Sequence, residues 1–161
     1  MAVDMFIKID GIKGESTDSK HKDEIDVLAW SWGLSQSGTT HTSTGGGAGK
    51  VNVQDLSVTK YVDKATTVLH LHCSSGKHIK EATLYVRKAG EKPLEYVKIS
   101  LKDLIVTSIS QAGHGGSDER LQETIGFNFA EFKYEYSAQK ADGSGDATQT
   151  FAYSIAKNEV L

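Results

Sequence analysis

The sequence is short of cysteine and of long apolar runs, and each shortage excludes a class of protein. Cys73 is the single cysteine, so no disulfide can form within the chain. Charges at Asp4, Lys8 and Asp10 interrupt the N-terminal segment, which therefore lacks the apolar centre of a cleaved signal peptide. We expect the chain to be made in the cytoplasm and not to be exported by a cleaved signal. No segment approaches the ~20 consecutive apolar residues of a membrane-spanning helix.

An excess of charge of one sign is also missing. Lysine and arginine total 18 against 21 aspartates and glutamates, a net charge of -3, and the two signs are interspersed. Proteins that bind nucleic acid usually carry a concentrated basic surface, which this distribution does not supply. We therefore expect that the protein neither binds nucleic acid nor inserts into a membrane. The length of 161 residues suits a single domain, residues 1–161, with its own core.

Short runs in which apolar and polar residues alternate dominate the sequence. Such alternation has the period of a β-strand with one buried face. The runs cover residues 5–9, 24–33, 82–88, 94–101, 124–137 and 151–155. Glycine-rich turn sequences separate them, which predicts a mainly β protein, an antiparallel sandwich or barrel. In the run 124–137 the apolar parity shifts by one near Ala130 and Glu131, which predicts a β-bulge.

One segment, residues 63–75, has a helical pattern. Asp63 is suited to cap the first turn, apolar residues follow at helical spacing, and Gly76 stands where a helix would end. The β-branched run 66–68 and the alternation in "VLHLHC" also fit a strand, so the local sequence leaves that alternative open.

The same segment contains residue types that zinc prefers. They are His70, His72, Cys73 and His78, in the spacing H-x-H-C-x4-H. On a helix, His70 and His72 would point about 200° apart and would not reach one ion. The spacing matches no common zinc module, so we expect surface histidines beside a buried thiol, with no metal and no cofactor.

A glycine-rich stretch, "HTSTGGGAGKVNVQDL" (residues 41–56), partly resembles a phosphate-binding loop. That motif, G-x-x-x-x-G-K-[ST], needs glycine where Thr44 stands and a hydroxyl residue where Val51 stands. A polar, β-branched stretch follows instead of a helix, so we interpret the segment as a loop between two strands. No convincing nucleophile, acid/base pair or metal cluster is present elsewhere, and we expect no enzymatic activity.

The run "EIDVLAWSWGLSQ" has two very different faces. Large apolar residues occupy one parity and small residues the other. The large ones are Leu28, Trp30, Trp32 and Leu34, and the small ones are Ala29, Ser31 and Gly33. The tryptophan face belongs in a core. A small face suits a sheet on which another backbone packs closely, or one that lines a passage, so we favour an interface or a pore.

Several unconnected segments resemble one family, the Hcp (hemolysin-coregulated) proteins of bacterial type VI secretion. They are "MAVDMFIKIDGIKGESTDSKH", "EIDVLAWSWGLSQSG", "GKVNVQDLSVTKYVDK", "CSSGKH" and "NFAEFKYEYSAQKADG". The likeness runs in order from Met1 to about Asp146, and the tail after Asp146 matches less well.

The resemblance implies a small antiparallel two-sheet β-barrel with the helix 63–75 at its side. It further implies homo-hexameric rings that stack into a tube. The tube carries a VgrG spike at its tip, and a contractile sheath drives it out of the bacterial cell. Effector proteins are carried in the lumen of the tube. Secretion without a signal peptide fits this route, because the tube is loaded from the cytoplasm.

On this interpretation the small face of Ala29, Ser31 and Gly33 lines the lumen and contacts effectors. Residues 38–50 would form an extended loop that reaches from one ring to the next, where glycine allows reach and pliability. The residues expected to mediate stacking are Thr40, His41, Thr42, Gly45, Gly46, Gly47 and Lys50. The alternative hypothesis is a non-secretory small β-barrel that binds a ligand, or a metal ion through the cluster from His70 to His78.

Overall fold

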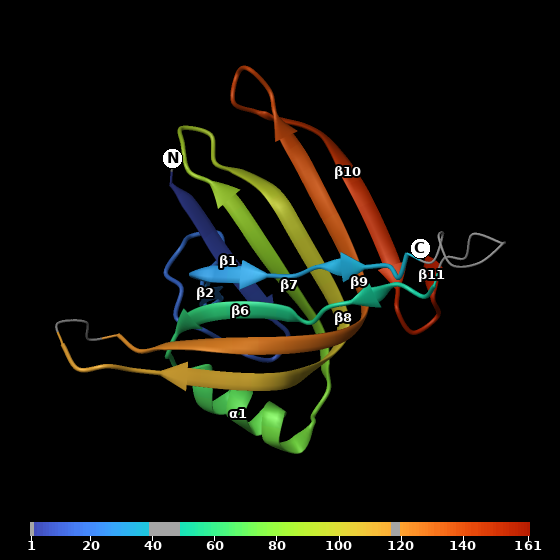
Figure 1. The fold of residues 1–161 in the computed structure, drawn as a ribbon. Coiled ribbons are helices and arrows are strands. Elements are labelled where there is room, and N and C mark those ends of the chain that lie inside the picture. Colours follow the sequence, from blue (N-terminus) through green and yellow to red (C-terminus); the bar gives the residue numbers. More distant parts are fainter. Residues whose placement is uncertain (1, 39–48, 117–119) are drawn as a thin grey trace.

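A computed structural model describes residues 2–38, 49–116 and 120–161 of the protein (Figure 1). These described residues form a nine-stranded antiparallel sheet, a two-stranded ribbon and the helix α1 (Thr66–Ser75). The strands are β1 (Val3–Ile9), β2 (Ile25–Asp26), β3 (Ala29–Ser31), β4 (Leu34–Ser35), β5 (Asn52–Val53), β6 (Leu56–Tyr61), β7 (Ile79–Lys88), β8 (Leu94–Ala112), β9 (Gln122–Gln139), β10 (Gly145–Ser154) and β11 (Glu159–Val160). The predicted mainly β, antiparallel architecture with one short helix is confirmed.

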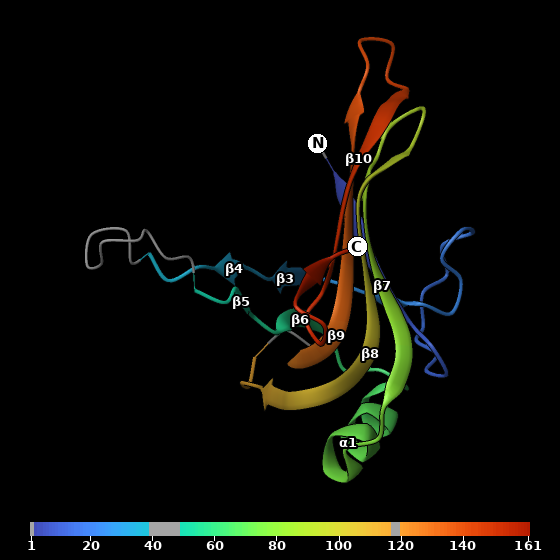
Figure 2. The same ribbon diagram turned by 90° about the vertical axis from the view of Figure 1, so that its right-hand side faces the viewer.

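Two long strands, β8 and β9, take part in both layers of the fold. The main path of the sheet runs β11-β10-β9-β8-β7-β1-β2, and β6 pairs with both β9 and β3. The first half of β9 pairs with β6 and the second half with β10. Figure 2 shows β8 and β9 bending at their lower ends, so that they pass from the upright layer into the layer of β6 and β3. Among the described residues this order shows two connected antiparallel layers, and a closed barrel is not detected.

The bend explains the parity shift seen in the sequence, and the predicted β-bulge near Ala130 is wrong. Pairing between β8 and β9 keeps one register from Leu101 with Phe132 to Leu104 with Phe129, so no residue is inserted there. Instead, Asp103 adopts a left-handed backbone with φ of 54°, a conformation that aspartate tolerates better than most residues. The irregularity in this pair of strands lies between Val106 and Ser108 of β8. Both strands turn a corner together and keep their apolar side chains inside.

The helix prediction is correct in type, but the helix begins later than expected. α1 starts at Thr66, and Asp63 lies in the turn before it, where its carboxylate accepts the backbone N–H of Ala65 at 3.0 Å. The end agrees with the sequence, because Gly76 is left-handed with φ of 68° and donates its N–H to the carbonyl of His72.

The core lies between the two layers and under α1. It is almost entirely aliphatic and aromatic, and every layer contributes to it. Its largest fully buried apolar side chains are Ile7, Ile25, Leu56, Leu69, Leu84, Ile99, Leu101, Leu104, Ile125 and Phe127. A core of this kind holds the two layers in a fixed relation to each other.

The connection between β1 and β2 is held against the sheet by charged side chains. Arg87 of β7 donates to both carboxylate oxygens of Asp18, at 3.1 and 2.6 Å. These hydrogen bonds hold the pKa of Asp18 well below its usual range. The buried ring of His21 stacks on Phe6 with ring centroids 4.5 Å apart. The connection is therefore a packed part of the fold.

Candidate functional site

Four strand segments form a small sheet whose outer face is lined by small side chains. The order of the segments is β3, β6, the first half of β9 and the second half of β8. Residues directly opposite each other in neighbouring antiparallel strands lie on the same face. The pairing therefore aligns three rows across the sheet. They are Ser31-Ser57-Gly126-Ser108, Ala29-Thr59-Thr124-Ser110 and Tyr61-Gln122-Ala112. We call this surface the small-residue wall.

The wall is polar and uncharged over most of its area. Serine, threonine, alanine and glycine make up two of its three rows, and the hydroxyls of Thr59 and Thr124 hydrogen bond across strands at 3.2 Å. Ala29 and Ser31 are both exposed, as the sequence predicted for this parity. Exposed sheet faces more often carry lysine, glutamate or arginine, so this composition is unusual for a face in contact with bulk solvent.

The opposite face of the same strands belongs to the core. Trp30 pairs with Val58, and Val58 with Ile125, so the large apolar side chains point inward. Trp32 packs edge-on against Phe132, with ring centroids 4.8 Å apart. The prediction that large apolar side chains of this strand face the core and small ones face away is thus correct at the centre of the strand. It is wrong at its ends, because Leu28 is 37% exposed and Leu34 is 46% exposed.

Neighbouring strands of the wall approach each other closely at Gly126. A Cβ atom placed on Gly126 would lie 2.5 Å from the hydroxyl of Ser108 on the neighbouring strand. At one end of the wall, Asp55 accepts hydrogen bonds from Thr107 and Asn128, both at 2.9 Å. These bonds tie β6, β9 and the irregular point of β8 together. No sequence pattern indicated this junction, because its members are far apart in the chain.

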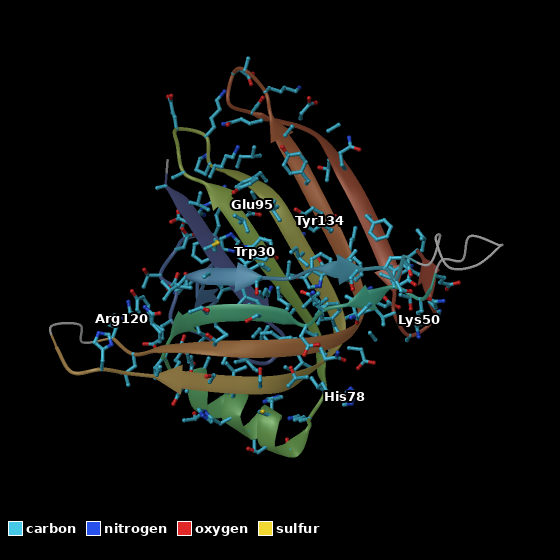
Figure 3. The ribbon with its side chains drawn as sticks, in the orientation of Figure 1. Trp30, Lys50, His78, Glu95, Arg120 and Tyr134 are labelled. Atoms are coloured by element: carbon cyan, nitrogen blue, oxygen red, sulfur yellow. The ribbon has the colours of Figure 1, made fainter. Side chains whose placement is uncertain are left out.

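The third predicted lumen residue, Gly33, lies beyond β3 and outside the three rows. Its carbonyl accepts the N–H of Gln54 at 2.9 Å, so it belongs to the crossing toward the β4-β5 ribbon. Six of the predicted stacking residues, Thr40, His41, Thr42, Gly45, Gly46 and Gly47, lie outside the described residues. Lys50 is described and exposed, and Figure 3 shows it at the opposite end of the molecule from Arg120.

The two histidines of α1 contact backbone carbonyl groups of the same helix. The Nδ1 atoms of His70 and His72 lie 2.7 and 2.8 Å from the carbonyls of Thr66 and Val68, one turn earlier. His72 is buried and Cys73 is half-buried, so the expectation of surface histidines beside a buried thiol is wrong for His72. Within the described parts of the chain, His, Cys, Asp and Glu side chains form no group of three or more that could hold a metal ion.

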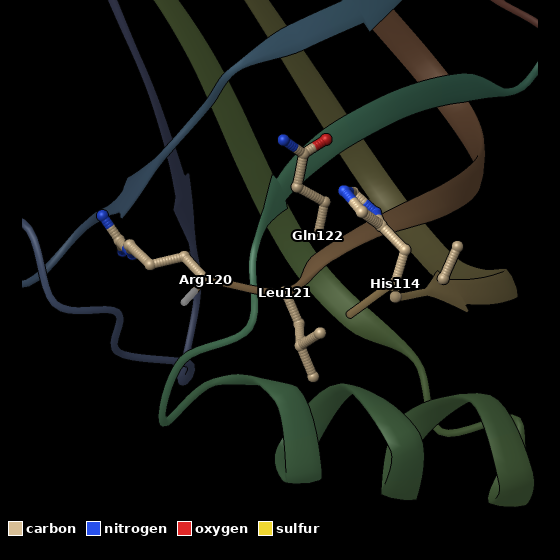
Figure 4. Close-up of a pocket in the computed structure, with 6 residues that line it drawn as sticks. His114, Arg120, Leu121 and Gln122 are labelled. Atoms are coloured by element: carbon tan, nitrogen blue, oxygen red, sulfur yellow. The ribbon is translucent and has the colours of Figure 1, made fainter. Parts of the chain in front are cut away.

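A small pocket of about 230 Å³ opens at the base of the hairpin between β8 and β9 (Figure 4). His114, Arg120, Leu121 and Gln122 line it, and the guanidinium of Arg120 lies 3.7 Å from the ring centroid of Tyr61. The hairpin therefore brings a cation to the end of the wall opposite Asp55.

The described helix is too short and too polar to cross a membrane.

A buried polar network behind the wall was missed by the sequence analysis. Glu123 is fully buried and contacts Lys60, while Thr66 and Gln111 donate to its carboxylate at 2.7 and 2.8 Å. Burial opposes ionisation of Glu123, but the hydrogen bonds from Lys60, Gln111 and Thr66 outweigh it and lower the pKa. Neither Lys60 nor Glu123 lies in one of the strand runs predicted from the sequence, and no local pattern linked the two residues.

Comparison with known proteins gives a consistent result. The family described as "Type VI secretion system effector, Hcp" matches residues 6–136. The chain is 56% identical over 147 residues to the protein hcp1 of Pseudomonas aeruginosa, and the match covers 91% of this chain and 90% of the relative.

Solved structures agree. One is a type six secretion system protein with a TM-score of 0.94 and 30% identity, covering 99% of this chain and 100% of the other. A second is Hcp1 from Salmonella typhimurium, with a TM-score of 0.82 and 42% identity over the full length of both chains.

Proposed function

The chain belongs to the Hcp family of type VI secretion proteins, and from this premise we propose that it is the structural subunit of a secreted tube built from stacked hexameric rings. Hcp is a family of secreted type VI components and not a known enzyme family. In the proposed assembly the small-residue wall faces the lumen and contacts effector proteins.

The observation that carries this proposal is the pair of open edges on the wall. β3 pairs only with β6, so its other edge has no strand partner among the described residues. At the far side of the wall, pairing of β8 with β7 ends at Leu104, and no described strand continues it. Open edges invite pairing with another chain. A heterologous contact between the β3 edge of one copy and the β8 edge of the next repeats around an axis and closes into a ring.

The composition of the wall supports its placement on the inside. A lumen that transports folded proteins must be free of bulky side chains, and two rows of serine, threonine, alanine and glycine meet that need. The outward face of the upright layer is different. There Glu81 pairs with Lys102 and Lys102 with Glu131, a mixture of charges that suits contact with solvent or with a polar partner such as a sheath.

Further parts of the proposal rest on membership of the family. The joined edges would continue the two described layers into a barrel-like wall shared by neighbouring subunits. Residues 38–50 would contact the next ring, the VgrG spike would close one end of the tube, and a contractile sheath would surround it. The protein would leave the bacterial cytoplasm through this apparatus.

The size of the purified protein tests the proposal. Sedimentation at micromolar concentration and ordinary salt should give a single closed oligomer, with the mass of six subunits. Replacing Ser108 or Ser110 on the β8 edge by proline should yield monomers, because proline removes the N–H needed for edge pairing. Proline at Thr150 on the distant strand β10 is the matched control. A monomeric unmodified protein would contradict the proposal.

A further inference from the structure

Residues 10–24, which connect β1 to β2, cover two aromatic side chains on the outward face of the upright layer. Phe6 of β1 pairs with Tyr85 of β7, and Tyr85 has the same parity as Glu81, so both rings point outward. Figure 2 shows the connection, in blue, on the side of this layer away from β3 and β4. The ring of His21 stacks on Phe6, and its centroid lies 4.7 Å from that of Tyr85. Phe6 is therefore only 5% exposed.

The imidazole of His21 lies between two carboxylates. Its Nδ1 atom is 3.0 Å from Oε2 of Glu24, within the connection, and its Nε2 atom is 2.5 Å from Oε1 of Glu95, on β8. His21 is 4% exposed, so water has little access to either ring nitrogen. An ionised carboxylate only accepts hydrogen bonds, and a neutral imidazole has a single N–H to donate. Both contacts are therefore hydrogen bonds only when the ring is a doubly protonated imidazolium.

The nearby cation of β7 is already compensated. The guanidinium of Arg87 lies 5.1 Å from the centre of the Phe6 ring, and it forms ion pairs with Asp4 and Asp18. Its hydrogen bonds to Asp18 hold the pKa of that carboxyl well below its usual range, so this pair keeps both charges near neutral pH. Asp18 belongs to the connection, which is therefore fastened at this point independently of His21.

The remaining groups around the imidazole also keep their charge near neutral pH. The ammonium of Lys98 lies 5.7 Å from the centre of the Tyr85 ring. Burial, together with the charges of Glu24 and Glu95, raises the pKa of Tyr85, so its phenol stays neutral. His21 is thus the group in this cluster whose charge changes close to neutral pH.

We propose that His21 is a pH-sensitive latch, which holds the connection on the outward face when its ring is protonated and releases it when the ring is neutral. Loss of the proton removes one of the two hydrogen bonds and leaves two carboxylates beside a ring without charge. The latch therefore contributes stability below the pH at which the ring loses its proton, and none above it. Release uncovers Phe6 and Tyr85, while Asp18 stays fastened. A single subunit suffices, so the inference does not depend on the proposed ring.

Backbone hydrogen exchange of the purified protein tests the inference. Gly14, Ser16, Asp23 and Glu24 donate their N–H groups to carbonyls within the connection, so the protection of these amides reports whether it is closed. After correction for the intrinsic effect of pH on exchange, their protection should fall about tenfold or more between about pH 6 and pH 9, because a charge-assisted hydrogen bond is lost. Amides that join β8 to β9 should keep their protection.

The fall should coincide with the loss of a ring proton from His21, followed by the nitrogen chemical shifts of the imidazole in NMR spectra. Protection of the connection that does not change with pH would overturn the inference. So would a fall in protection that occurs while the ring keeps both protons. Both measurements use the unmodified protein and need no variant to fold.

Two substitutions that change the net charge equally separate the latch from a general effect of charge. Glu95→Gln should keep the connection closed at both ends of the pH range, because an amide can accept from a protonated ring and donate to a neutral one. Glu24→Gln tests the same rule at Nδ1. Glu81→Gln, on the same outward face, is the matched control and should retain the full dependence on pH. Equal effects of Glu95→Gln and Glu81→Gln would overturn the inference.

Discussion

Lys60 of β6 and Glu123 of β9 meet inside the protein, although they are 63 positions apart in the chain. Their charged groups are in direct contact, and both side chains are almost completely buried, at 1% and 0% exposure. Lys60 also reaches the carboxylate of Asp63 at 2.9 Å, just before α1. The network thus fastens the helix to the back of the small-residue wall.

Removing one partner of this ion pair should be strongly destabilising. Glu123→Gln leaves the ammonium of Lys60 buried with less compensation and should cost about 3–5 kcal/mol of unfolding free energy, as measured by denaturant titration. The double variant Lys60→Met with Glu123→Leu should cost clearly less than either single change, because no charge then remains buried. A purely additive double variant would contradict this account of the network.

The same network should make the protein sensitive to acid. The folded-state pKa of Glu123 is lowered from 4.5, so ionised Glu123 contributes stability that is present above that value. The contribution is lost as the pH falls through the lower folded-state pKa. Thermal unfolding measured from pH 6 downward should therefore show a fall in stability below about pH 4.5 that is shallower in the Glu123→Gln variant.

Gly14 should tolerate no side chain. A Cβ atom there would lie 2.5 Å from the carbonyl oxygen of Glu24 and 2.7 Å from Ile25, and a backbone atom cannot move aside cheaply. Gly14→Ala should lower stability by about 1–3 kcal/mol. Gly115, whose Cβ would meet nothing within 4 Å, is the matched control, and Gly115→Ala should be nearly neutral. Equal effects of the two substitutions would show that the close approach at Gly14 is relaxed in solution.

Trp30 should matter for stability and Ser31 for cargo. Trp30 is half-buried against the core, so Trp30→Ala should lower the free energy of unfolding by about 2–3 kcal/mol.

Ser31→Gln adds bulk to the exposed wall, so rings should form normally while retention of a cognate effector falls. Chromatography and effector co-purification measure the two effects. A ring that breaks would place Ser31 at the subunit contact, and a ring that binds cargo as before would place it outside the lumen.

Deleting residues 42–47 should separate assembly from stability. We expect the melting temperature to change little, because the proposed role of this loop is contact between rings. Tube formation and secretion should both be impaired. A large drop in melting temperature would show that the loop stabilises its own subunit, contrary to the proposal.

The sequence alone determined that the protein is mainly β and which residues at the centre of β3 share a face. Alternation between neighbouring residues reports a local property, because successive side chains of a strand emerge on opposite faces whatever the strand pairs with. That is why the positions of Ala29, Ser31 and Trp30 were predicted correctly. The family was also recognisable, because its likeness is spread over many short segments.

Only the tertiary structure decided which strands pair and where the sheet bends. The parity shift near Ala130 looks the same in the sequence whether a residue is inserted or two paired strands turn together, and only the register with Leu101 and Leu104 separates the two. Likewise, the buried Lys60 is compensated by the carboxylate of Asp63 nearby in the chain and by that of Glu123, which comes from a strand distant in the sequence. Strand pairing depends on contacts between residues far apart in the chain, and such contacts leave no local pattern.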